Sequence, residues 1–510
     1  MSASPYTRKS ARSAAFFAIV FRVPGQIATL IGYVVLVRFL SESEFGVYSL
    51  FYATLPLVGT LISFGLENTL KRYQPEYLRK GENRLAHRLT RRIGQFRLVS
   101  TTIFLIVIVL FWTQIAPFFK IAEYRDQFLL FGLVIIAHFQ CQVLVISLSA
   151  HLLQKFSVGI TAVFSILKLV GYSLAAGLFG FDLWMAFIVD LIAYAVFYVG
   201  LKYAYLKKPD HSSGEQVSLP PQERKRLTRY AAYYSFNDAG TLTLDTRKES
   251  FFLAALLDTV SVGAFAFAER FNVMLGRISP IHLLDSVVQP LFVSLDYKQY
   301  PERIHKYFSL LINTALLVRL PTFVFTACYH AQIVEVLFGG RFMEYSYLLA
   351  VVAMFSMGTV IGPPVTLVAQ MEEKAQFVLA SKIFGVYGIA ASLLLIPVIG
   401  VLGAAIASGT AILMKNLFIW WFVRKLARWR SAFTFITRAA LIWGTFVALV
   451  VLQQRWLGGG SLLELASGLL VWCGFFLLQV RAAMGPEERQ IVAGLFSGRE
   501  LKLLRLFGVA

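Results

Sequence analysis

The chain has 510 residues, of which 57% are hydrophobic and 15% are charged, and its mean hydropathy is +0.67. This composition excludes an ordinary water-soluble enzyme or binding domain. The formal net charge of +20 does not indicate nucleic-acid binding, because the Lys and Arg residues gather in the short segments between long apolar stretches.

About fourteen apolar stretches of roughly 20 residues or more predict membrane-spanning helices, since a helix of that length crosses a hydrocarbon core of ~30 Å. The first stretch follows a basic start and is long enough to span, so we expect no cleavable signal peptide. Cys141, Cys328 and Cys473 lie in or beside these stretches without paired spacing, which predicts neither disulfides nor a metal framework. The predicted spans are 14–38, 46–69, 98–119, 128–150, 157–180, 183–204, 229–256, 262–293, 306–329, 345–370, 376–397, 400–423, 433–454 and 461–481.

Basic residues fall mainly on one side of the membrane when alternate connections are assigned to opposite sides. That side holds both chain termini and the connections 70–97, 202–228 and 424–430. The other side holds little beyond Lys120, Arg125, Arg341 and Arg455. This asymmetry predicts that the N- and C-termini lie in the cytoplasm.

The stretch 229–256 is the most polar of the predicted spans. As a helix, it places Asp238, Thr241, Asp245 and Lys248 on one face, because they are spaced by three or four residues. Such a helix fits against a water-filled cavity. The alternative is a surface amphipathic helix, which would move every later basic connection to the outside, so we expect a span.

The polar segment 205–228, with two prolines in tandem, predicts a cytoplasmic linker. It separates an N-terminal lobe of six helices, residues 1–204, from a C-terminal lobe of six helices, residues 229–425. An extra helix pair follows at 426–482. The tail 483–510 alternates basic and apolar residues, which predicts a helix lying on the cytoplasmic membrane face.

A faint internal repeat relates the two halves. Gly46 and Gly263 occupy equivalent positions, and each is followed thirteen residues later by another glycine, Gly59 or Gly276. Because each half has six spans and starts on the same side, the repeats would be parallel and related by an axis along the membrane normal. We therefore expect an all-α polytopic protein of about 14 transmembrane helices, with two six-helix lobes around a central cavity plus the C-terminal helix pair.

Charged residues lie inside the predicted spans, where each costs at least ~2.5 kcal/mol in hydrocarbon. We therefore expect them to face a wet, protein-lined interior, as in a transporter with a charged internal pathway. The basic members are Arg22, Lys168, Arg247, Lys248, Arg270, Arg277 and Arg319, and the acidic candidates are Asp190 and Asp245.

Residues 36–73 resemble the polysaccharide flippases of the multidrug/oligosaccharidyl-lipid/polysaccharide exporter superfamily. Those proteins carry a similar turn between their first two spans, matched here by Arg38, Leu40, Ser41, Glu44, Phe45, Gly46 and Tyr48. An Asp followed by a basic residue in span seven, and a glycine with an aromatic opening span eight, also match. The arrangement of spans is alike over residues 14–425, whereas the amino-acid sequence is alike only in these short patches. Members commonly have twelve spans, and an extra pair occurs in some relatives, including the lipid II flippases.

The resemblance implies a flippase that moves an undecaprenyl-diphosphate-linked oligosaccharide from the cytoplasmic to the periplasmic leaflet of the bacterial inner membrane by alternating access. A diphosphate cannot cross hydrocarbon bare, so such a protein needs cations in a sealed cavity. Arg270 and Arg277 share a helix face and lead the candidates together with Arg22; Arg247, Lys248, Lys168 and Arg319 complete the set.

The competing interpretation of these charges is structural. The leading arginines would then pair with Glu67, Glu269 or Asp285, and Lys168 and Arg319 with a carboxylate across a helix interface. Asp245 and Asp190 are candidate coupling sites for Na+ or H+, whereas Asp182 is expected to cap a helix. Pro290 and the segment 362–364 predict helix kinks, which are either bending points or static.

Three alternative functions stay open: a multidrug or metabolite exporter of the same superfamily, a membrane-embedded polysaccharide polymerase, and a transport subunit of a secretion complex. The sequence contains neither a phosphate-binding Gly-Lys-Ser/Thr segment nor a metal-binding His cluster, so we expect no enzymatic activity and no cofactor beyond a coupling ion. The expected partners are the lipid-linked oligosaccharide, membrane lipids and a polysaccharide synthesis or export complex, and not nucleic acid.

Overall fold

The computed structural model describes residues 8–151, 153–207, 220–277, 301–429, 432–456 and 460–483, and every regular element in these ranges is a helix. Eleven of the described helical segments are long and apolar enough to cross a membrane. They coincide with eleven of the predicted spans, which confirms the all-α polytopic class. The count of fourteen stays a prediction, because the stretches 14–38, 229–256 and 262–293 are outside that set.

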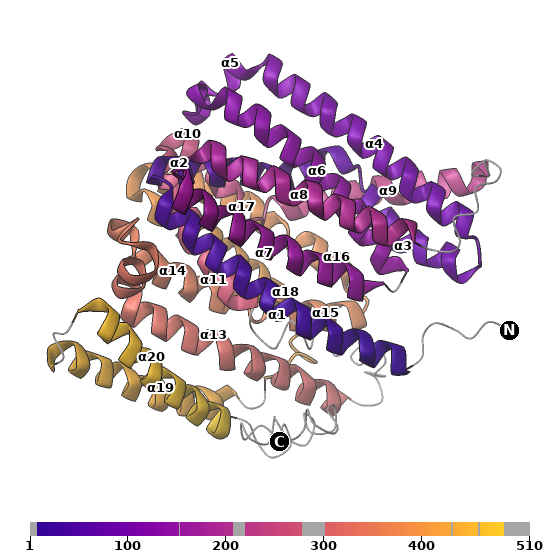
Figure 1. Ribbon diagram of the computed structural model, residues 1–510. Coiled ribbons are helices and arrows are strands. Elements are labelled where there is room, and N and C mark those ends of the chain that lie inside the picture. Colours follow the sequence, from indigo (N-terminus) through magenta and orange to yellow (C-terminus); the bar gives the residue numbers. More distant parts are fainter. Residues whose placement is uncertain are drawn as a thin grey trace. The chain divides into compact units, whose positions relative to one another are not determined.

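The chain forms two compact units, residues 1–266 and residues 267–510, called unit 1 and unit 2 below. In unit 1, α1 packs along α7, α6 against α8, and α4 against α6 (Figure 1). The elements that begin in unit 1 are α1 (Arg8–Phe39), α2 (Glu42–Ser63), α3 (Leu66–Arg79), α4 (Asn83–Leu110), α5 (Trp112–Ile115), η1 (Pro117–Phe119), η2 (Ala122–Tyr124), α6 (Arg125–Ala150), α7 (Gln154–Leu178), α8 (Leu183–Leu206), α9 (Pro221–Leu242), α10 (Lys248–Leu256) and α11 (Thr259–Arg277), the last of which continues into unit 2.

The start of α2 explains the short motif that the sequence shares with flippases. Ser41 and Glu44 form a capping box: the Glu44 N–H donates to Ser41 Oγ (3.2 Å), and the Ser41 N–H donates to Glu44 Oε2 (3.1 Å). Gly46, one turn later, packs directly on the start of α11, where an added Cβ would overlap the carbonyl oxygen of Thr259 and approach Gly263. The two repeat-equivalent glycines therefore meet, and the duplication itself stays a prediction.

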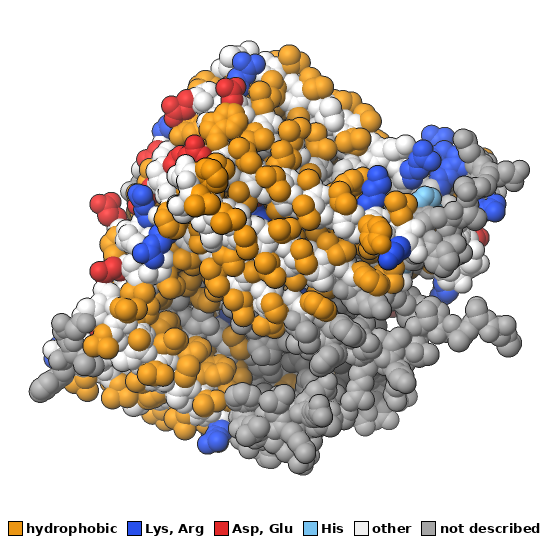
Figure 2. All heavy atoms as spheres, in the orientation of Figure 1, with side chains coloured by type: hydrophobic (Ala, Val, Ile, Leu, Met, Phe, Trp, Pro, Cys, Tyr) orange, Lys and Arg blue, Asp and Glu red, His pale blue; other side chains and the backbone are white. Residues whose placement is uncertain are grey.

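One end of unit 1 is strongly basic, and we call it the basic end. The expected loop 70–97 is wrong, because this segment forms α3 and the first half of α4, joined by a turn at residues 80–82. Tyr73 and Tyr77 of α3 pack with Leu89 of α4 and Leu227 of α9, an apolar periodicity that a count of charges overlooks. Lys and Arg side chains gather at this end, apolar side chains cover the middle of the visible face, and acidic and basic side chains mix at the opposite end (Figure 2). The exposed basic residues of α3 and α4 are Lys71, Arg72, Arg79, Lys80, Arg84, Arg91 and Arg92.

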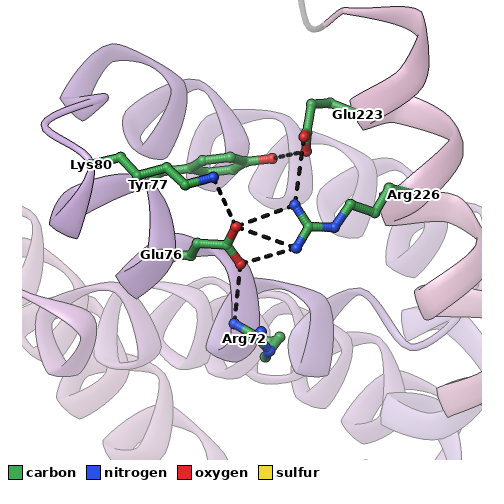
Figure 3. Close-up of polar contacts among 6 residues, drawn as sticks. All are labelled: Arg72, Glu76, Tyr77, Lys80, Glu223 and Arg226. Atoms are coloured by element: carbon green, nitrogen blue, oxygen red, sulfur yellow. Dashed lines mark hydrogen bonds and ion pairs between the residues drawn. The ribbon is translucent and has the colours of Figure 1, made fainter.

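Glu76 fastens α9 to α3 at the basic end (Figure 3). Its carboxylate accepts from Arg226 of α9 at 3.2–3.3 Å, from Lys80 at 3.0 Å and from Arg72 at 3.2 Å. The hydrogen bonds from Lys80 and Arg226 lower the pKa of Glu76. Tyr77 Oη donates to Glu223 at 3.0 Å, so a second contact joins the same two helices.

Unit 2 is built around the long helix α13, which bends at Tyr329. Its apolar core joins Ile304 and Phe308 of α13 with Val365 of α15 and Ile419 of α18. The predicted kink at residues 362–364 is confirmed, because α14 ends at Gly358 and α15 begins at Gly362. The remaining elements are α13 (Pro301–Phe338), η3 (Met343–Tyr345), α14 (Tyr347–Gly358), α15 (Gly362–Met371), α16 (Ala375–Ala380), α17 (Ile383–Ile399), α18 (Val401–Val423), α19 (Ala432–Trp456) and α20 (Ser461–Ala483).

The C-terminal helix pair, α19 and α20, is attached to α13 by polar contacts. Tyr329 Oη donates to Gln453 Oε1 (2.7 Å), and the Trp472 indole donates to the Pro321 carbonyl (2.9 Å). The predicted lobe boundaries stay predictions; in the structure, α9 and α10 pack on α2 and α3 within unit 1. The linker residues 208–219, Asp285, Pro290 and the tail after residue 483 lie outside the described residues.

Candidate functional site

Lys168 and Asp190 form a buried ion pair between α7 and α8. Lys168 Nζ lies 2.7 Å from Asp190 Oδ1, and Asp190 is fully buried. Tyr48 (3.0 Å) and Tyr52 (2.5 Å) of α2 donate to Asp190 Oδ2, and Tyr172 of α7 donates to Oδ1. Four donors occupy the lone pairs of this one carboxylate. The predicted pairing of Lys168 with a carboxylate across a helix interface is confirmed.

A second buried pair joins α3 and α4, and the sequence interpretation missed it. Arg97 is buried, pairs with Glu67, and holds its guanidinium 4.2 Å from the centroid of the Phe139 ring. Gln142 Nε2 donates to Glu67 at 3.1 Å. The distribution of basic residues instead predicts that Arg97 ends the connection 70–97. A signal was present, because Ile93, Arg97 and the next buried positions of α4 follow helical spacing.

His138 of α6 lies within range of the charges of three basic residues of unit 1. Its Nδ1 is 3.0 Å from Tyr194 Oη, and the ring is half-buried. The charges of Arg97, Lys168 and Arg247 all act on this imidazole. Residues from α4, α7 and the segment before α10 therefore contribute positive charge to this region, and each has a carboxylate partner.

A helix break lies next to this region. The predicted continuous helix over 229–256 is wrong, because α9 ends at Leu242 and α10 begins at Lys248. Asp245 Oδ1 accepts the Arg247 backbone N–H at 2.9 Å, a local bond that competes with helix formation. Asp238 and Thr241 lie on α9, whereas Asp245 lies in the break, so the four residues do not share one continuous helix face. Broken helices at membrane depth occur where they are covered by protein or line an aqueous cavity.

The charged residues of the break differ in how tightly they are paired. Arg247 Nε is 3.5 Å from Asp245 Oδ1, and the side chain of Arg247 is 52% exposed. Lys248 Nζ lies 2.7 Å from Glu249, which is fully buried and which sequence reasoning did not single out. Arg247 is therefore the accessible cation of this segment, and Lys248 is already neutralised.

The leading arginines of the sequence interpretation are not gathered within either unit. Arg22 is exposed on α1 in unit 1, and Arg270 is half-buried on α11 in unit 2. Arg277 ends α11, and its side chain lies outside the described residues. Their common role stays a prediction. Glu67, one partner that the alternative interpretation offers these arginines, pairs with Arg97 in the structure.

Arg319 of α13 repeats a feature of unit 1. Its guanidinium packs on Gly276, where an added Cβ would overlap it, and in unit 1 Gly59 faces Arg97 Nη2 at 3.6 Å from its ideal Cβ. Gly59 and Gly276 are the second pair of repeat-equivalent glycines. An arginine of the following long helix thus packs on the equivalent glycine in each half.

The remaining sequence predictions concern the helix cap at Asp182, the three cysteines and metal binding. Asp182 caps α8 through a hydrogen bond from the Met185 N–H at 2.8 Å, as expected. The three cysteines are free. Among the described residues, no group of three or more His, Cys, Asp or Glu side chains is arranged to hold a metal ion.

Comparisons with known proteins give the same picture of the fold. A family model described as polysaccharide biosynthesis protein matches residues 35–347, more than half of the chain. An uncharacterized membrane protein of Methanocaldococcus jannaschii is 24% identical over 434 residues, which cover 78% of this chain and 82% of that protein.

Two solved transporter structures superimpose over most of the chain. The lipid II flippase MurJ in an inward closed conformation matches with a TM-score of 0.67 and 13% identity over 91% of this chain and 99% of that chain. An inward-facing multidrug resistance MATE family transporter of the MOP superfamily matches with a TM-score of 0.65 and 15% identity over 81% and 98%. At these identities the likeness is one of fold.

Proposed function

Because the chain belongs to the polysaccharide biosynthesis protein family, we propose that it moves a polyprenyl-diphosphate-linked oligosaccharide across the bacterial inner membrane by alternating access. The fold shared with MurJ and with a MATE transporter supports transport rather than catalysis. The exposed Lys and Arg of α3 and α4 support a cytoplasmic location for the basic end and for both termini.

The observation that carries this proposal is the half-exposed Arg247 in the break before α10. An anion that reaches this point meets a guanidinium whose ion pair in the described part of the chain is a 3.5 Å contact to Asp245, together with the N-terminal end of α10. Helix N-termini and guanidinium groups both favour phosphate oxygens, and discontinuous helices mark substrate sites in many transporters. We therefore assign the first diphosphate contact to Arg247.

The coupling ion is assigned to Asp245 rather than Asp190. Asp190 already accepts from an ammonium group and three tyrosines, so a further cation would have to displace them. Asp245 is partly exposed, and its one cationic partner among the described residues is Arg247, the group that turns toward the cargo. When Arg247 binds the diphosphate, Asp245 loses its counter-charge and gains affinity for Na+ or H+, which links ion binding to cargo binding. Arg22, Lys248, Arg270, Arg277 and Arg319 are proposed as further cations along the path.

The first test is where the lipid-linked intermediate accumulates when the chain is deleted. Spheroplasts are treated with an external glycan-modifying enzyme, and we expect the intermediate to build up in a protected, cytoplasmic-leaflet form. An intermediate that accumulates but is accessible would indicate polymerisation or another cargo, and a missing intermediate would indicate an earlier enzymatic step.

The second test addresses Arg247. In the same assay, Arg247→Gln should leave the intermediate protected, and Arg247→Lys should restore part of the activity because it keeps the charge. Arg224→Gln, an exposed arginine at the start of α9, is the matched control and should behave as wild type. Normal flipping by Arg247→Gln would refute the assignment of the diphosphate contact.

A further inference from the structure

The helix α9 presents two large aromatic side chains that the described residues leave mostly exposed. Phe236 is 80% exposed and Tyr233 is 66% exposed. Together with Arg229 and Gly240 they share one helix face, since the spacings are four, three and four residues. The guanidinium of Arg229 lies 5.9 Å from the centroid of the Tyr233 ring.

The opposite face of α9 is fixed to the rest of unit 1, so the aromatic face has a defined direction. Leu227 and Ala231 are buried, and Gly65 lies so close to the Ala231 carbonyl that an added Cβ would overlap it. Asn68 Nδ2 donates to Asp238 at 2.8 Å on that same side. These contacts on α3 and the turn before it hold the two rings outward.

The rings lie between the basic end and the helix break. Arg226 is held by Glu76 at the basic end, and Phe236 follows ten residues later, a rise of ~15 Å along the helix. That is about half the thickness of the hydrocarbon core. The break begins one to two turns beyond Phe236. A cargo whose diphosphate rests at Arg247 would therefore have its head group beside α9.

The composition of this face argues against lipid contact. α8, another helix of unit 1, exposes aliphatic side chains such as Ile192, Val196 and Val199. α9 instead exposes Asn237 and Thr241 beside its rings and is not among the apolar spans. Amide and hydroxyl side chains in hydrocarbon would be costly, so a wet surface fits the residues better.

We propose that Tyr233 and Phe236 form a stacking platform for a sugar ring of the cargo. A pyranose offers an apolar C–H face to an aromatic ring and a rim of hydroxyl groups to polar side chains. The amphipathic Tyr233 ring, with Asn237 and Thr241 beside it, matches both features. The diphosphate, in contrast, matches the cations of the break. The platform rests on the proposed function, which supplies the glycan, and it gives that cargo a site for recognising its sugar.

Binding of two probes to the full-length protein in lipid nanodiscs tests the platform. One probe is the lipid-linked oligosaccharide extracted from the source organism, and the other is a polyprenyl diphosphate of equal chain length without sugar. The double variant Tyr233→Ala/Phe236→Ala should bind the glycosylated probe roughly tenfold more weakly and the bare probe unchanged. The ring-retaining double variant Tyr233→Phe/Phe236→Tyr should stay within about threefold of wild type, since each threefold is ~0.7 kcal/mol.

Two comparisons make the outcome decisive. Phe179→Ala removes an aromatic side chain that is 73% exposed away from α9, and it should change neither affinity. Equal losses for both probes in the double alanine variant, or no loss for either, would overturn the platform. Failure of the wild-type protein to bind either probe would overturn the proposed function itself, which is a different result. An unchanged melting temperature of the double variant is expected, because both side chains are exposed.

Discussion

Replacing Asp190 with asparagine is expected to destabilise unit 1 strongly. The substitution keeps one acceptor oxygen, enough for Tyr48 and Tyr52, but it places an NH2 donor against Tyr172 and leaves the Lys168 ammonium, 2.7 Å from Oδ1 in the wild type, without its counter-charge. Breaking a buried pair from one side costs about 3–5 kcal/mol. Lys168→Met should cost less, about 2 kcal/mol, because three tyrosine hydroxyls still donate to the carboxylate.

The double variant Lys168→Met/Asp190→Asn separates this explanation from simple loss of packing. It removes both charges and keeps the volume, so its destabilisation should be smaller than the sum of the single effects by at least ~1 kcal/mol. Denaturant unfolding of the detergent-solubilised protein, followed by tryptophan fluorescence, measures the free energy of unfolding of the wild type, the two single variants and the double variant. Glu344→Gln, at an exposed acid, is the control. If the destabilisations of the two single variants add up to that of the double variant within about 0.5 kcal/mol, the two charges do not interact.

Other substitutions test separate parts of the structure. Gly46→Ala should sharply lower the yield of folded protein in size-exclusion chromatography because its Cβ would overlap α11, whereas Gly444→Ala, with open space around it, should not. Glu76→Gln should speed trypsin cleavage at the start of α9. In the wild type, the pKa of Glu76 is lower in the folded protein than its unfolded value of 4.5. The ionised carboxylate therefore contributes its full stabilisation above about pH 4.5, and the stabilisation is lost as the pH falls through the folded-state pKa. The start of α9 should loosen in the wild type over that acidic range. Arg22→Ala and Arg270→Ala should each abolish export without affecting membrane insertion; normal export by both would remove these arginines from the path.

Sequence patterns predicted most of the fold because hydropathy and spacing are properties of single helices. The glycine spacing that begins at Gly46 also predicted an internal repeat, and Gly46 packs on Thr259 and on Gly263, its equivalent in that repeat. These signals are local or periodic, so no knowledge of tertiary contacts was needed to find them.

The errors arose where tertiary or side-chain interactions decide the structure. The break at Asp245 depends on a carboxylate that bonds the backbone two residues later, an interaction that a helical face pattern does not record. The sequence analysis places Arg97 in a basic loop because the predicted span begins only at residue 98. In the structure α4 begins at Asn83, so Arg97 lies within the helix and is buried. Its partner Glu67 comes from another helix, so no spacing rule could have paired them.

Of the three cations near His138, we propose that Arg247 binds the cargo, because the three differ in how they are paired. If Arg97 or Lys168 turned to a diphosphate, Glu67 or Asp190 would lose its counter-charge inside the protein, at a cost of about 2 kcal/mol or more. Arg247 can turn away cheaply, because Asp245 is partly exposed and can be solvated or take up an ion. A carrier has to bind and release its cargo in every cycle, so a weak, replaceable ion pair suits that step. Arg97 and Lys168 then hold α3, α4, α7 and α8 in place around it.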